Sequence, residues 1–159
     1  MKNKMNQVII DVNERLNEIP LSFINKQIII GGMAMEYYGM RKAGRDIDLI
    51  ISQDDYHLLS GKYPDNKKDL YGDLGFLINK FEIWRSIALI DYDFFLKDAI
   101  DEGNVLIVSI GRLLWMRVCA MEVEKYKKDL YLMKEYYYTN FRNQNYLQEY
   151  SVRNPSGKL

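Results

Sequence analysis

The sequence predicts a mixed α/β (α+β) fold, in which a small mixed sheet is flanked by helices and followed by a helical C-terminal segment. Three observations support this class. Residues 5–18 carry apolar side chains at helical spacing, residues 28–30 form a β-branched run typical of a buried strand, and residues 111–150 return to a helical pattern. The sequence therefore alternates between the two periodicities.

One domain is expected, because 159 residues suffice for a single sizeable core. We place this domain at residues 1–150, with a core at about residues 20–110 and a helical segment at about 111–150. The tail at 151–159 contains Asn154-Pro155-Ser156-Gly157 and is expected to be disordered.

The first half of the chain has clear boundaries. Pro20 should end the first helix, and a second helix at 33–38 should end at Gly39, a natural C-cap. A second strand is expected at 46–52, and the acids at 54–55 should begin the next helix.

The second half starts with a predicted loop at 61–73, which contains two glycines and a proline. A β-hairpin should follow, with strands at 74–78 and 81–90 joined by Asn79-Lys80. After it we expect a helix at 94–100 and a strand at 105–108.

The helical segment should begin where Ser109 caps a long apolar helix that starts near Arg112. A second helix is expected at about 125–141. Its tyrosines offer rings on which bases stack, but Tyr131 and Tyr136 lie near the apolar stripe, so we interpret them as packing residues.

Composition narrows the possible classes of protein. Lys+Arg and Asp+Glu are both 22, so the chain has neither the basic excess typical of nucleic-acid binders nor the acidic excess typical of disordered tails. A small polynucleotide substrate stays open if the charges are segregated between faces. Cys119, the single cysteine, rules out an intramolecular disulfide, and its apolar neighbours predict a buried thiol. No run reaches the ~18 apolar residues of a membrane span, and no signal-peptide core follows Met1, so we expect a cytoplasmic protein.

The first chemical motif is Gly31-Gly32, between the β-branched strand and the next helix. Without a Cβ, the backbone N–H groups there can approach an anion closely. The pair is therefore a candidate nucleotide-binding turn for the outer phosphates of a triphosphate. A plain tight turn is the simpler alternative.

Two acids then stand at i and i+2 in a strand, so their carboxylates point to the same side of the sheet. Asp46 and Asp48 supply hard oxygen ligands suited to Mg²⁺. The alternative is a pair of strand-end salt bridges to Arg41 or Arg45.

A third acid, Glu82, lies between apolar neighbours on the predicted adjacent strand. Asp46, Asp48 and Glu82 together could hold two Mg²⁺ ions as a metal site and catalytic centre. The rival acids, Asp91 and Asp93, are expected at the start of a helix, where capping is the better interpretation.

Three cations complete the candidate nucleotide site. Arg41 and Arg45 stand beside the acids as triphosphate clamps, and Lys128 could reach a phosphate from the second long helix. Ordinary solvated charge is the alternative for each, and for Lys128 we prefer it. His57 is read as a residue at the surface or the edge of the core.

In this order, Gly31-Gly32, Asp46-Ile47-Asp48 and Phe81-Glu82-Ile83 resemble the signature of the polymerase-beta-like nucleotidyltransferase superfamily. The stretch from Gly31 through Leu49 is similar to the bacterial abortive-infection-type nucleotidyltransferases, some of which are toxins of toxin–antitoxin pairs.

The distal runs Leu113–Arg117 and Lys128-Asp129-Leu130 look like the helical segment of those proteins, which commonly carries a lysine and a Lys-Asp pair. The resemblance spans about residues 25–132. Three positions depart from it: Gly44 replaces a hydroxyl residue, Glu82 replaces the usual aspartate, and Arg117 stands where a lysine is expected.

The resemblance implies a nucleotidyltransferase fold and Mg²⁺-dependent transfer of a nucleoside monophosphate from a triphosphate such as ATP. The acceptor hydroxyl could belong to a tRNA end, a protein or a small molecule, and a protein partner or second copy could complete the cleft. Two alternatives stay open: a degenerate, nucleotide-binding regulatory module, and a structural interaction domain whose acids only form salt bridges.

Overall fold

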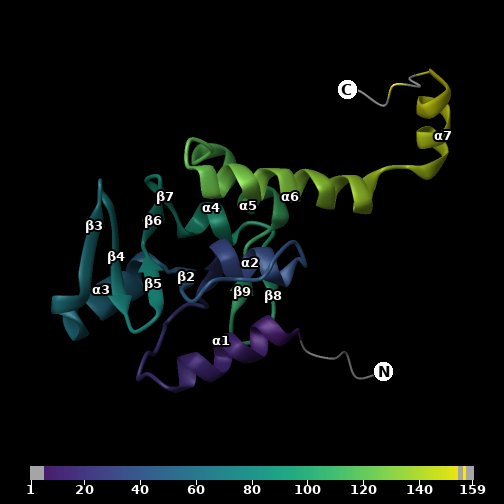
Figure 1. Ribbon diagram of the computed structural model, residues 1–159. Coiled ribbons are helices and arrows are strands. Elements are labelled where there is room, and N and C mark those ends of the chain that lie inside the picture. Colours follow the sequence, from purple (N-terminus) through teal and green to yellow (C-terminus); the bar gives the residue numbers. More distant parts are fainter. Residues whose placement is uncertain (1–5, 154–155, 157–159) are drawn as a thin grey trace.

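The computed structural model describes residues 6–153 and residue 156. A sheet lies at its centre, α1 lies on one side, and α5 and α6 lie on the other (Figure 1). The helices are α1 (Gln7–Asn17), α2 (Gly31–Tyr37), α3 (Gln53–Lys62), α4 (Tyr92–Leu96), α5 (Ile110–Cys119), α6 (Glu124–Phe141) and α7 (Gln144–Arg153), with a 3-10 turn at Pro64–Asn66.

The main sheet is mixed and has seven strands in the order β3-β4-β5-β2-β1-β9-β8. Its strands are β1 (Ile28–Ile30), β2 (Ile47–Ile50), β3 (Lys67–Leu70), β4 (Asp73–Ile78), β5 (Phe81–Trp84), β8 (Ile100–Asp101) and β9 (Leu106–Ile107). The pairs β2–β5 and β1–β9 are parallel, and the other neighbours are antiparallel. The mixed α/β class predicted from the sequence is confirmed.

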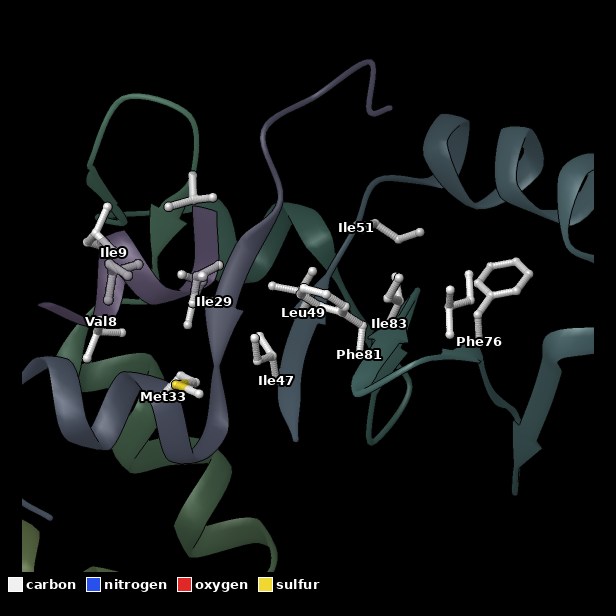
Figure 2. Packing of buried hydrophobic residues seen from close by; sticks show 14 of the residues in the cluster. Val8, Ile9, Ile29, Met33, Ile47, Leu49, Ile51, Phe76, Phe81 and Ile83 are labelled. Atoms are coloured by element: carbon white, nitrogen blue, oxygen red, sulfur yellow. The ribbon is translucent and has the colours of Figure 1, made fainter. Parts of the chain in front are cut away.

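Strand alternation divides the interior into two cores. Ile29 joins the core beneath α1, whereas its neighbours Ile28 and Ile30 join the core beneath α5. Figure 2 shows the first core, where Ile29, Leu49 and Ile83 from three strands pack together. Both faces of the central strands are buried, which explains the continuous apolar run in β1.

The same alternation positions the acids. Ile47 and Leu49 enter the first core, so Asp48 between them faces the side of the sheet covered by α5. Asp48 is paired in register with Glu82 of the parallel strand β5. The two carboxylates therefore lie on neighbouring strands and on one face.

The capping predictions agree with the structure. The Ser109 side chain accepts a hydrogen bond from the Arg112 backbone N–H at the start of α5. Gly39 follows α2 with φ +76°, the left-handed conformation that a helix-ending glycine adopts. The Asn79-Lys80 turn joins β4 to β5, with Asn79 at φ +52°.

Three predicted boundaries were wrong. Residues 67–70, expected in a loop, form the exposed edge strand β3, whose polar side chains gave no apolar alternation to detect. The strand expected to reach Ile90 ends at Trp84, and a separate ribbon follows, formed by β6 (Ser86–Ile87) and β7 (Ile90–Asp91). The helix predicted from Phe94 to Ile100 is α4, which ends at Leu96, and Ile100 begins β8.

The C-terminal prediction was also wrong in part. Residues 151–153 continue α7 and do not belong to a disordered tail, whereas 154–155 and 157–159 lie outside the described residues. Within the described chain, no helix is both long and apolar enough to cross a membrane.

Cys119 is exposed, not buried as predicted. The buried face of α5 is formed by Leu113, Met116 and Arg117, and Cys119 projects from another side of the helix. The apolar sequence around the thiol therefore misled the prediction, because a charged residue occupies part of the buried face instead.

Candidate active site

Gly31 begins α2 in a conformation that requires glycine. Its φ is +64°, and a Cβ at this position would lie 2.5 Å from Oδ2 of Asp48. The absence of a side chain is thus what allows the Asp48 carboxylate to lie against the start of the helix.

Gly32 is under weaker constraint. A Cβ there would lie 3.5 Å from Nη1 of Arg41, an ordinary contact distance. The helix that follows this predicted phosphate-binding turn, α2, has only seven residues, so its dipole adds little to any attraction for an anion. Gly32 is half-buried and lines the polar cavity described below, where its backbone is compatible with an anion.

The central carboxylates have no counter-ion in contact. Within the described residues, neither Asp48 nor Glu82 forms a hydrogen bond or an ion pair. The pKa of Asp48 is raised to about 6, chiefly by burial and next by the neighbouring charge of Glu82, while Arg117 and Lys125 oppose the shift. Two close acids without a counter-ion are a suitable binding place for a cation.

A polar cavity of about 220 Å³ opens beside these acids. It gathers six of the predicted site residues, together with three that were not predicted as site residues. The lining is formed by Gly32, Arg41, Gly44, Arg45, Asp46, Asp48, Glu82, Lys125 and Tyr126. Three cations, three acids and an open glycine backbone form the chemical surroundings that a metal-bound polyphosphate needs.

The remaining predicted residues lie elsewhere. Gly31 lines the neighbouring apolar cavity. Lys128 is exposed on α6 and lines none of the cavities found near the acids, whereas Lys125 from the first turn of α6 does. The two lysines are three residues apart in α6, so Lys128 lies about 4.5 Å further along the helix axis than Lys125.

The loop that carries the two arginines is held by Glu36. Its carboxylate accepts hydrogen bonds from the Ala43 backbone N–H at 2.7 Å and from Lys42 Nζ at 3.0 Å. The bond from Ala43 is the main reason that the pKa of Glu36 is lowered. This contact fixes the loop next to Gly32 and gives Arg41 a defined approach to the polar cavity.

Asp129 forms a buried ionic centre with two arginines. Nε and Nη2 of Arg41 donate to its two oxygens at 2.6 and 2.9 Å. Nε of Arg117 lies 3.0 Å from Oδ2 of Asp129, but the geometry is not that of a hydrogen bond, so this N–H remains unsatisfied. One buried carboxylate thus serves two cations, and burial lowers the pKa of Arg117.

An apolar cavity of about 210 Å³ lies on the other side of the acids. It shares Asp48, Glu82 and Tyr126 with the polar cavity. Its other lining residues are Ile30, Gly31, Leu70, Asp73, Trp84, Ile87, Met116, Arg117 and Ala120.

The predicted metal triad is only partly assembled. Asp48 and Glu82 are partners across adjacent strands, while Asp46 is exposed just before β2 begins. In residues 6–153, no three His, Cys, Asp or Glu side chains are gathered as a ready-made metal site. The donor chemistry nevertheless fits Mg²⁺, because a divalent cation would relieve the repulsion between two unpaired carboxylates.

The rival acids occupy a different place. Asp91 is the N-cap residue of α4, but its side chain makes no capping hydrogen bond. It lines a cavity of about 300 Å³ together with Asp93 and Arg85, and this cavity contains none of the candidate site residues. His57 is exposed, as predicted, and its ring contacts the Gln53 side chain.

Four site residues were missed or assigned no role: Arg117, Lys125, Tyr126 and Asp129. Arg117 and Asp129 interrupt the apolar helical patterns around them, and this interruption was the signal available in the sequence. The structure shows that both side chains are buried. Tyr131, in contrast, was interpreted as a packing residue but is 63% exposed, whereas Tyr136 does pack against Tyr38.

No known protein-family model matches the chain, and no curated protein matches it in sequence. The resemblance described above therefore depends on the motifs themselves and on the arrangement of the residues that carry them.

Proposed function

We propose that the chain is a Mg²⁺-dependent nucleotidyltransferase with the polymerase-beta-like fold, which transfers a nucleoside monophosphate from a triphosphate to an acceptor hydroxyl. The observation that carries this proposal is the position of Asp48 opposite Glu82, directly beside a cavity lined by Arg41, Arg45 and Lys125. Carboxylates that can bind a metal ion therefore lie next to cations that can bind phosphate.

In this proposal the triphosphate lies in the polar cavity. Arg41 and Arg45 bind its outer phosphates, and the Gly32 backbone donates to a phosphate oxygen. Lys125, from the first turn of α6, supplies a third positive charge to this cavity. These groups position the leaving pyrophosphate and balance the charge that it gains.

The acids hold the metal and receive the proton. Asp48, with Asp46 and Glu82, would bind Mg²⁺, which supplies charge neutralisation and activates the acceptor hydroxyl. The acceptor oxygen forms a bond to the α-phosphorus as the bond to the bridging oxygen of pyrophosphate breaks. Glu82 takes the proton of the acceptor hydroxyl.

The test is transfer of label from α-³²P-labelled nucleoside triphosphates into RNA, protein or small-molecule fractions. Asp48→Asn should abolish the labelled product while the protein remains folded. The control is Asp91→Asn, in the separate cavity, which should transfer normally. Equal labelling by wild type and Asp48→Asn would disprove the assigned site.

A second candidate function is nucleotide binding without transfer. The observation that favours it is the incomplete metal triad, in which Asp46 is exposed and Glu82 stands where an aspartate is expected. Stabilisation by Mg²⁺–ATP with no labelled product in any fraction would support this regulatory role over the enzymatic one.

A further inference from the structure

The apolar cavity lies in line with the polar cavity along the strands. Side chains two residues apart share a face and are separated by about 6–7 Å along a strand. On that face, Asp46 lies before the acid pair and lines the polar cavity, whereas Trp84 follows Glu82 and lines the apolar one. Asp48 and Glu82 therefore separate two spaces of opposite character.

The apolar cavity has the size of a small ring system. Its volume of about 210 Å³ exceeds the roughly 150 Å³ of an engineered cavity that binds benzene, and it is smaller than the roughly 300–1,000 Å³ of sites for drug-sized ligands. Trp84 and Tyr126 provide aromatic surface, and Ile87 and Met116 provide aliphatic surface. These walls suit a flat one- or two-ring group.

Arg117 adds a buried positive charge to the wall of this cavity. Its side chain is 4% exposed and lines the cavity. Its Nε lies 3.0 Å from Oδ2 of Asp129 and is itself buried, so this atom belongs to the ionic centre and is not a donor for a ligand. The groups that can meet a ligand hydroxyl are therefore the carboxylates of Asp48 and Glu82, which also line this cavity.

We propose that the apolar cavity binds the reacting end of the acceptor, a compact one- or two-ring group that presents its hydroxyl to Asp48 and Glu82. This inference rests on the proposed function. In-line displacement places the attacking oxygen on the side of the α-phosphate opposite the leaving pyrophosphate. Because the cations place pyrophosphate in the polar cavity, the acceptor enters from the apolar one.

The same geometry separates the acceptor from the nucleoside of the triphosphate. A larger acceptor would insert only its terminal one or two rings, since the apolar cavity of about 210 Å³ leaves no room for more. The base of the triphosphate is also a flat ring system and could occupy the same cavity. The experiment therefore has to distinguish a bound acceptor from a bound base.

The experiment fills the cavity and measures three properties. Ala120→Leu, at the end of α5, and Ile87→Phe, in β6, add side-chain volume to the lining. Ala99→Leu is the matched control, because Ala99 is also partly buried but lines none of these cavities. For each variant we measure stabilisation by Mg²⁺–ATP, pyrophosphate release with water as acceptor, and binding of ring alcohols by Trp84 fluorescence. Trp115→Phe serves as the background, so that Trp84 is the only tryptophan.

The probes are adenosine, cytidine and N-acetyltyrosine amide, added with Mg²⁺ and saturating α,β-methylene ATP. We expect at least one probe to bind saturably, with at least tenfold weaker binding in both filled variants and no change in Ala99→Leu. The rise in melting temperature caused by Mg²⁺–ATP and the rate of pyrophosphate release should each stay within about twofold of the value for the background protein.

Two results would overturn the inference. If no probe binds, or if filling leaves probe binding unchanged, the cavity is not an acceptor site. If filling weakens Mg²⁺–ATP binding as strongly as probe binding, the cavity holds the base of the triphosphate, and the proposed function survives without this acceptor site. Absence of Mg²⁺–ATP stabilisation in the background protein would instead reject the proposed function itself.

Discussion

At the scale of single residues, Asp48 combines a structural cost with a chemical role. Its carboxylate lies under Gly31 and opposite Glu82, and burial is the main cause of its raised pKa of about 6. A carboxyl group whose pKa is higher in the folded than in the unfolded chain destabilises the fold when it ionises. A bound cation would remove that cost.

The first prediction concerns pH. Relative to Asp48→Asn, wild type should lose stability as the pH rises from about 4, the unfolded pKa, through about 6, the folded pKa. The shift of about 2 pH units corresponds to roughly 3 kcal/mol at most. Denaturant unfolding of both proteins at pH 4 and pH 7.5 without Mg²⁺ measures this difference. A constant difference between the two proteins would contradict the assigned environment of Asp48.

The second prediction concerns Gly31. Gly31→Ala should destabilise the protein by at least about 2 kcal/mol, because it combines a strained positive φ with a clash against Asp48. Gly39→Ala is the control: it shares the positive φ but has nothing within 4 Å, so it should show the smaller strain alone. In the double variant Gly31→Ala/Asp48→Ala, part of the loss should be recovered, and strict additivity would argue against the clash.

At the scale of elements, Asp129 joins α6 to the loop after α2 and to α5. Its two arginine partners line different cavities, Arg41 the polar one and Arg117 the apolar one. The helical segment predicted from the sequence is therefore part of the site wall, and its ionic centre fixes the position of both cations.

The third prediction follows from that centre. Asp129→Asn should destabilise the protein by about 3–5 kcal/mol, because it leaves two largely buried cations without an anion. Asp101→Asn, which removes an exposed partner of Lys26, should leave the melting temperature nearly unchanged. Thermal unfolding of both variants makes the comparison. A similar melting temperature for Asp129→Asn and wild type would show that the centre contributes little.

At the scale of the whole molecule, the site belongs to the sheet and the helices packed on it, whereas α7 lies apart from that body (Figure 1). None of the described side chains of α7 belongs to either core. The body should therefore fold without this helix.

The fourth prediction tests this separation. A chain ending at Arg142 lacks α7 and should melt within about 2 °C of the full chain, because no described α7 side chain belongs to either core. It should also keep any stabilisation by Mg²⁺–ATP. A large fall in melting temperature would show that α7 packs against the body in solution.

Much of the fold was determined by local sequence. The β-branched run at 28–30, the Ser109 cap and the Asn79-Lys80 turn each specify an element through nearest-neighbour chemistry, and all three are found as predicted. Polar or very short elements carry no such pattern. For that reason the exposed strand β3 and the ribbon of β6 and β7 were not found from the sequence.

For the candidate site, the sequence by itself determined the acids and the glycines, because strand alternation fixes which side chains share a face. Arg41 and Arg45 were also proposed from the sequence, but only the tertiary structure decided which lysine joins them and what holds Arg41 in place. Lys125 replaces Lys128 at the cavity, and Asp129 binds Arg41 across 88 residues of chain. Such contacts depend on how α6 packs across the sheet, and helix packing is a property of distant surfaces that no local pattern encodes.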